Sequence, residues 1–354
     1  MTKLLVVVGT GGVGKTTIAA ALALVAAREG KRAMVLTIDP ARALARAMGL
    51  ATLSATGQRV SLELPGVLSA AMLDQKQSWD AFVKRHAPNA SVARALLANP
   101  FYQRLSTSFA GSTEYMAIEE LCRLAESGEH DVIVLDTPPA AHALDFVRAP
   151  ERLDRLLAPD VAAWFARPYG VWRSAGAGAR FLLRRLERAT GRSTLRDISS
   201  FFVSLDALIA GMLARARRVR ALLAGDAGFV LVALPRQLVV AETEVLAAKL
   251  RQMHLAAAIV NRVHPVPVAT REAEASLAAL GDNPPATWLR QAWSDALAEA
   301  RDEQTQIDRF AATLPAGVRL TRIAEADHDV HTLSDLAMIA DQLCAAKSSW
   351  SPSA

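Results

Sequence analysis

Residues 6–17 read Val-Val-Val-Gly-Thr-Gly-Gly-Val-Gly-Lys-Thr-Thr. From Gly9 onward the stretch fits Gly-x-x-x-x-Gly-Lys-[Ser/Thr], the pattern of a loop that cradles phosphates between a strand and a helix. The flanking sequence predicts both partners, because residues 4–8 are apolar and β-branched and residues 18–28 are rich in alanine and leucine. We therefore expect a nucleotide-binding α/β protein of the phosphate-loop class.

Each position of the loop has an expected task. Backbone N–H groups of Gly11, Gly12, Val13 and Gly14 would surround an anion, since glycine permits the required turns and the helix adds its positive end. Lys15 would bridge the β- and γ-phosphates as a catalytic cation, the Thr16 hydroxyl would hold Mg²⁺, and Thr17 would complete the cofactor contacts.

Bulk composition excludes several classes of protein. The chain has 354 residues, and its 52% hydrophobic content is ample for a sizeable core. Two distant cysteines, Cys122 and Cys344, argue against a disulfide scaffold and a C-x-x-C metal site. The longest apolar run is too short to span a bilayer and the first residues do not form a signal peptide, so we expect a cytoplasmic location.

The positive charge is unevenly spread. Arginines crowd residues 167–196 and 215–220. Nucleic acid or an acidic partner would suit such a segment, but solvated helix faces are the favoured interpretation, because no base-stacking aromatic pattern accompanies the arginines.

Two aspartates follow predicted strands. The strand at residues 32–37 ends at Ile38-Asp39-Pro40-Ala41, and Asp39 could orient or deprotonate an attacking water, hold the metal through water, or cap the next helix. The strand at residues 132–135 ends at Asp136, the position of the aspartate that contacts the Mg²⁺ shell in phosphate-loop enzymes. Asp39 and Asp136 are thus both candidate metal ligands, and Asp39 is also a candidate catalytic residue.

The remaining pattern alternates between strands and helices. We expect strands at residues 59–64, 67–73, 229–234, 257–263 and 318–323, and helices at 75–86, within 91–126, and at 240–253 and 333–344, with two exposed helices within 268–312. This predicts a mostly parallel central sheet flanked by helices, plus an α-helical insertion. The expected domains are an ATPase domain at 1–150 and 226–346, a helical client or partner region at 75–126 and 150–224, and a disordered tail at 347–354.

Two polar features near the end of the chain have more than one interpretation. Asn261 could read a base edge with its amide or cap a turn. Asp327, His328, Asp329 and His331 suggest a metal, but the solvated start of the last helix is the favoured interpretation.

These motifs, in this order, resemble the ArsA family of ATPases, which belongs with MinD and ParA to the deviant-Walker group. The resemblance rests on residues 9–17, on Thr37 to Ala41, on Leu135 to Pro139 with His142, on Glu242-Thr243-Glu244 and on Ile259-Val260-Asn261. It implies ATP and Mg²⁺ as ligands, Asp39 as the water-positioning carboxylate, Asp136 at the second switch and Asn261 on adenine. Ala324 and Glu325 would complete the base pocket through their backbone.

The resemblance also implies a dimer with ATP at the interface, and one phosphate loop makes this chain one half of it. The family usually has a lysine at the position of Thr10, which reaches the partner's phosphates. The family includes a branch that targets tail-anchored proteins and a branch of arsenite-pump ATPases. The zinc-binding C-x-x-C of the targeting branch is missing after Asn261, so no zinc is expected, and the cysteine cluster of the arsenite branch is missing as well.

Three functional hypotheses follow. The first is a dimeric ATPase whose nucleotide state controls how the helical region holds a client or partner. The second is a weakly catalytic regulatory subunit of a heterodimer, because Thr10 cannot supply the charge in trans and would lower the hydrolysis rate. A MinD/ParA-like positioning ATPase ranks lowest, since the chain lacks a terminal amphipathic membrane helix.

Overall fold

The computed structural model describes residues 2–38, 43–55, 57–108, 112–138, 227–265, 271–281 and 283–345, together with 215, 218, 221–223 and 225. Asp39, the tail at 347–354 and nearly all of the expected helical insertion at 150–224 lie outside these residues.

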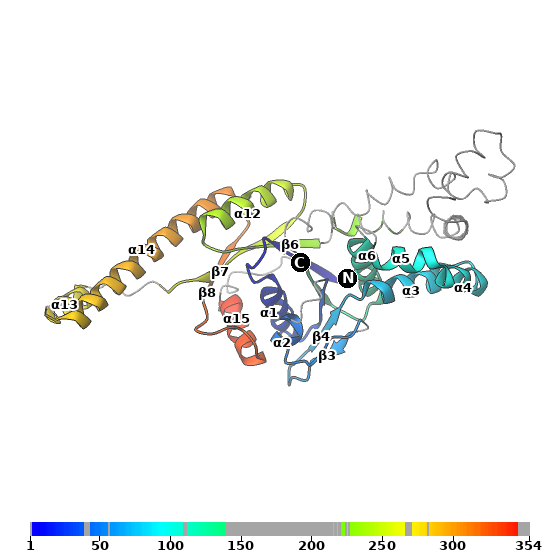
Figure 1. Cartoon of the computed structure of the whole chain (residues 1–354), viewed down its shortest axis with the longest axis horizontal. Coiled ribbons are helices and arrows are strands. Elements are labelled where there is room, and N and C mark those ends of the chain that lie inside the picture. Colours follow the sequence, from blue (N-terminus) through cyan, green and yellow to red (C-terminus); the bar gives the residue numbers. More distant parts are fainter. Residues whose placement is uncertain are drawn as a thin grey trace, which may run out of the picture.

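One eight-stranded sheet forms the centre of the molecule (Figure 1), with the strand order β3-β4-β2-β5-β1-β6-β7-β8. Every neighbouring pair is parallel except β3 with β4. The strands are β1 (Lys3–Gly9), β2 (Arg32–Thr37), β3 (Gln58–Arg59), β4 (Val67–Met72), β5 (Val132–Asp136), β6 (Ala227–Ala233), β7 (Leu255–Val263) and β8 (Leu320–Ala324). The expected mostly parallel sheet flanked by helices is confirmed.

Helices cover both faces of the sheet. On one face lie α1 (Lys15–Arg28), α2 (Ala43–Ala47) and α15 (Leu333–Ala345), which pack on one hydrophobic cluster. The other face carries α3 (Gln75–His86), α4 (Ala90–Ala98), α5 (Pro100–Ser108), α6 (Ser112–Ser127), α12 (Gln237–Lys249) and α14 (Pro284–Thr313). Parallel strands buried on both faces read as continuous apolar runs, which explains why their sequences show no polar alternation.

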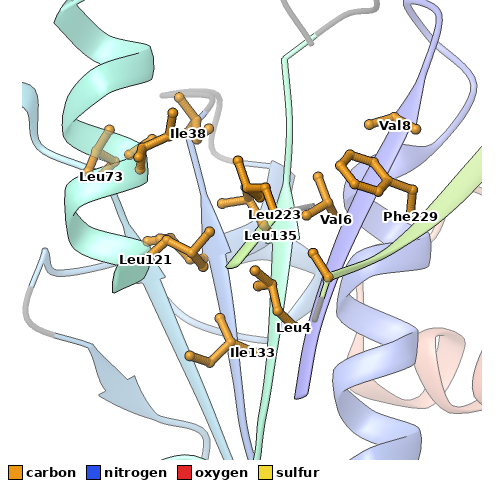
Figure 2. Packing of buried hydrophobic residues seen from close by; sticks show 14 of the residues in the cluster. Leu4, Val6, Val8, Ile38, Leu73, Leu121, Ile133, Leu135, Leu223 and Phe229 are labelled. Atoms are coloured by element: carbon orange, nitrogen blue, oxygen red, sulfur yellow. The ribbon is translucent and has the colours of Figure 1, made fainter. Parts of the chain in front are cut away.

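The inner strands divide their side chains between the two clusters. Figure 2 shows Leu4, Val6 and Val8 of β1 beside Ile133 and Leu135 of β5, and these residues belong to one cluster with Leu121 of α6. Val7 of β1 and Val134 of β5 point to the opposite cluster, as the two-residue period of a strand requires. The sheet edge where β1, β2 and β5 end is thereby held between two packed layers.

The expected strand at residues 59–64 is wrong in length. The strand comprises only Gln58 and Arg59, and Val60 adds one more hydrogen bond to Leu68 of β4. The N–H of Leu62 then bonds to the carbonyl of Val60, which turns the chain away from β4. The other strands agree with their expected positions to within a few residues.

The segment at 268–312 contains two helices, as expected, but they are not exposed throughout. Helix α13 (Arg271–Ala279) has no buried residue, whereas α14 buries Ala300, Glu303, Ile307 and Phe310 in its second half. Asn283 caps α14 by accepting the N–H of Ala286. A helix of 30 residues is about 45 Å long, and its first half projects with α13 away from the sheet (Figure 1).

The first turn of α15 is organised by Asp335. Its carboxylate accepts the backbone N–H groups of His331 and Thr332 and contacts Nε2 of His328 at 3.1 Å. These bonds hold the pKa of Asp335 well below its ordinary value. The arrangement agrees with the interpretation of residues 327–331 as the solvated start of a helix.

Candidate nucleotide site

The loop between β1 and α1 adopts a shape that only its glycines permit. Gly12 has φ 76° and Gly14 has φ 89°, both in the left-handed region that side chains disfavour. Gly14 is also the residue from which α1 begins, so the backbone N–H groups of the first turn face the loop. A β-carbon at Gly14 would lie 2.3 Å from Nδ2 of Asn261, whereas one at Gly12 would meet nothing within 4 Å.

The loop is anchored from inside. Val13 is fully buried in the cluster under α1, and its carbonyl accepts Nδ2 of Asn261 at 2.9 Å. Lys15 is only 7% exposed, and its Nζ donates to the carbonyl of Thr10 at 2.7 Å. The ammonium of Lys15 is therefore held against the loop that the sequence predicts to surround phosphate.

A carboxylate at the end of β5 joins the loop to the next strand. Oδ2 of Asp136 accepts the hydroxyl of Thr16 at 2.8 Å and that of Thr37 at 2.9 Å. Parallel pairing of β2 with β5 places Thr37 opposite Asp136, and the carboxylate is 1% exposed. The predicted pair Thr16 and Asp136 is thus brought into direct contact.

This donor set fits Mg²⁺. Hydroxyl and carboxylate oxygens are the protein ligands that a hard divalent cation prefers, and such ions usually bind through one or two of them together with substrate phosphates. Thr16 and Asp136 supply one of each at the mouth of the loop. Asp39 lies outside the described residues, so its catalytic and metal roles stay predictions.

Thr37 is a site residue that the sequence motifs did not single out. It ends β2 two positions before Asp39, and its hydroxyl shares Oδ2 of Asp136 with Thr16. Sheet geometry could have identified it, because the carboxyl ends of parallel strands lie at the same edge of the sheet. A hydroxyl at the end of β2 must then face the aspartate at the end of β5.

Asn261 reaches the loop because β7 is irregular at that point. Arg262 has φ 55°, a left-handed conformation, and the register between β7 and β8 shifts between Val260 and Val263. This bulge accompanies the close approach of Asn261 to Val13. The structure therefore gives Asn261 a supporting contact, and its expected contact with adenine stays a prediction.

The two remaining predicted residues lie at the end of β8. The N–H of Ala324 donates to Oε1 of Gln342, and the N–H of Glu325 donates to the carbonyl of Val263. Both N–H groups are thus bonded within the protein, and a contact of these residues with a base stays a prediction.

Thr10 is enclosed by the loop. It is 4% exposed, and among the described residues its hydroxyl has no hydrogen-bond partner. Its carbonyl receives the ammonium of Lys15. In this conformation the side chain at position 10 is buried within the chain.

Comparison with known proteins matches a family model and several curated relatives. Residues 2–163 match the family model of the ArsA anion-transporting ATPases. The chain is 36% identical over 156 residues to an uncharacterized protein of Streptomyces coelicolor, covering 44% of this chain and 39% of that protein. It is 32% identical over 151 residues to the ATPase GET3 of Malassezia globosa, covering 42% and 43% of the two chains.

A third relative extends the match. The chain is 30% identical over 211 residues to the ATPase get3 of Aspergillus terreus, covering 56% of this chain and 59% of the relative. The chain thus spans between about two fifths and three fifths of the curated relatives that it matches. In the part of the chain that the structure describes, no helix has the length and apolar character needed to cross a membrane.

Proposed function

Over residues 2–163 the chain belongs to the ArsA family of ATPases, and on that premise we propose that it binds and hydrolyses ATP as one half of a dimer. The nucleotide state would control how the helical region holds a client or partner. The observation that carries the proposal is the contact of Asp136 with both Thr16 and Thr37, beside a lysine held on the same loop.

Phosphate binding is the first step that these residues support. Lys15 lies against the carbonyl of Thr10, and a γ-phosphate would offer its ammonium a charged acceptor in place of a neutral one. Backbone N–H groups at the start of α1 supply further donors without side-chain rearrangement. When bound, Mg²⁺ would neutralise phosphate charge at Thr16 and Asp136.

The same contacts suggest how the site would signal. Asp136 shares one carboxylate oxygen between the loop and the end of β2. Any change at the Thr16 hydroxyl on nucleotide binding alters the hydrogen bond available to Thr37, two residues before Asp39. The segments that follow Asp39 and Asp136 would therefore respond together, which is the behaviour of a nucleotide switch.

ATP turnover over a wide range of chain concentrations tests this proposal, with Lys15→Ala as the control. A self-sufficient homodimer predicts turnover per subunit that rises with concentration, together with an ATP-dependent increase in mass by analytical ultracentrifugation. Turnover that is independent of concentration, or that survives in Lys15→Ala, would contradict it.

One observation favours a second candidate, a weakly catalytic subunit of a heterodimer. The side chain of Thr10 is buried and carries no charge, so it cannot stabilise phosphates across an interface. Charge supplied in trans can change phosphoryl-transfer rates by roughly 10³-fold to 10⁵-fold. ATP binding without turnover, restored by adding a related subunit with lysine at that position, would support this candidate. Turnover by the chain alone at a rate that the added subunit does not raise would exclude it.

A further inference from the structure

A second polar cluster lies away from the phosphate loop, where β7 ends. His264 follows the last residue of β7, Glu299 and Glu303 lie one turn apart on α14, and Glu325 follows β8. Nδ1 of His264 is 2.7 Å from Oε1 of Glu303 and 3.8 Å from Oε1 of Glu299. Three rigid elements thus bring one imidazole and three carboxylates together.

The cluster is held firmly on its inner side. Glu303 is 7% exposed, and its second oxygen accepts the backbone N–H of His264 at 2.9 Å. The same residue therefore fixes both the main chain and the ring of His264. Because Glu299 is one turn earlier on the same helix, its carboxylate lies on the same face of α14 as that of Glu303.

The far nitrogen of the ring is oriented by a carboxylate. Nε2 of His264 lies 2.8 Å from Oε2 of Glu325. With the Nε2 proton hydrogen-bonded to Glu325, loss of the proton that Nδ1 shares with Glu303 would leave the Nδ1 lone pair to bind an ion beside Glu299 and Glu303. Histidine ligands of metal ions are commonly oriented in this way, by a carboxylate on the nitrogen that does not bind the ion.

The charges in this cluster do not balance. Within the described residues no lysine or arginine forms an ion pair with Glu299, Glu303 or Glu325, so a charged His264 would still leave two negative charges in excess. A nearly buried carboxylate such as Glu303 is costly without full compensation, and a divalent cation would supply the missing charge.

From this geometry we propose that His264, Glu299 and Glu303 bind a divalent transition-metal ion. Their three ligand atoms lie within 4.8 Å of one another, a spacing that one ion can bridge. One nitrogen and two carboxylate oxygens suit Zn²⁺, Mn²⁺ or Co²⁺ better than Mg²⁺ or Ca²⁺, which select oxygen ligands alone. Water would complete the coordination on the side where Glu299 is exposed.

Such an ion would have a structural task. It would fasten the end of β7, three residues after Asn261, to the middle of α14. All of its ligands would come from one chain. They are not cysteines, so the missing C-x-x-C, which led us to expect no zinc, does not exclude this site. The proposal does not depend on ATP hydrolysis, because none of its ligands contacts the phosphate loop in the structure.

The test is direct metal binding by the full-length chain after chelation and without nucleotide. Co²⁺ is the spectroscopic probe, because its visible absorption reports coordination by protein ligands, and Zn²⁺ is titrated by calorimetry. We expect one ion per chain at this site and a rise in melting temperature on addition of Zn²⁺. The decisive variant is Glu299→Gln, because an exposed carboxylate can be replaced without unfolding the chain.

Matched variants separate this site from adventitious binding. His264→Gln should abolish the Co²⁺ spectrum, and Glu325→Gln should weaken affinity by about 10-fold to 100-fold, as for other groups that orient a ligand. His328→Gln is the control, because His328 also contacts a carboxylate but belongs to no group of three candidate ligands among the described residues. Absence of Co²⁺ bands, or binding equal in wild type, Glu299→Gln and His264→Gln, would overturn the proposal.

Discussion

Replacing Gly14 by alanine should destabilise the phosphate loop more than the same change at Gly12. Both glycines have positive φ, so each substitution carries a backbone strain of about 1–2 kcal/mol. Only at Gly14 does the new β-carbon meet another group, Nδ2 of Asn261 at 2.3 Å. That amide must move, and the loss of its buried hydrogen bond to Val13 costs about 1–3 kcal/mol more.

The expected totals are therefore about 2–5 kcal/mol for Gly14→Ala and about 1–2 kcal/mol for Gly12→Ala. Both free-energy changes can be measured by urea unfolding without nucleotide, followed by far-UV circular dichroism. The comparison requires that the slope of the unfolding free energy against urea concentration is the same in all variants. The clash can be isolated in a double-mutant cycle. In an Asn261→Ala background the cost of Gly14→Ala should fall to that of Gly12→Ala. Equal costs for the two single variants, or additivity in the cycle, would refute the reasoning.

Three further predictions address the carboxylates and thiols. Asp136→Asn keeps an oxygen that can accept the two hydroxyls but loses the negative charge, so the apparent affinity for Mg²⁺ in ATP turnover should fall about 10-fold to 100-fold. An unchanged Mg²⁺ requirement would count against the site. Burial raises the pKa of Cys122 to about 11, so a thiol reagent at pH 8 should modify only the half-buried Cys344 until urea is added. Rapid modification of both cysteines without urea would be inconsistent with the fold. The lowered pKa of Asp335 contributes stability that is present above its unfolded pKa of about 4 and lost as the pH falls toward the folded value. Asp335→Asn should therefore destabilise the chain more at pH 7 than at pH 3, and an equal effect at both would be contrary evidence.

Local sequence was sufficient to predict the centre of the site. The glycine pattern determines the loop, and apolar runs that end at Thr37 and Asp136 determine where the neighbouring strands stop. Because parallel strands end at the same edge, the contact between Thr16 and Asp136 follows from these signals alone.

Contacts between distant segments could not be predicted in this way. Asn261 is separated from Val13 by 248 positions, and their hydrogen bond depends on a bulge at Arg262 that no composition signal marks. The burial of Glu303 is similar, since a glutamate on a polar helix predicts an exposed position. Only the packing of α14 on the sheet brings it to His264.

The place of β1 within the sheet has a consequence during translation. This strand is complete at Gly9, yet its neighbours β5 and β6 begin only at Val132 and Ala227. At about 5–20 residues per second, β1 is synthesised roughly 6–25 s before β5 begins, and longer before β6. The amide that supports Val13 comes later still, at residue 261. A nascent or truncated chain can thus carry the whole phosphate-binding motif before the strands and the side chain that position it have been made.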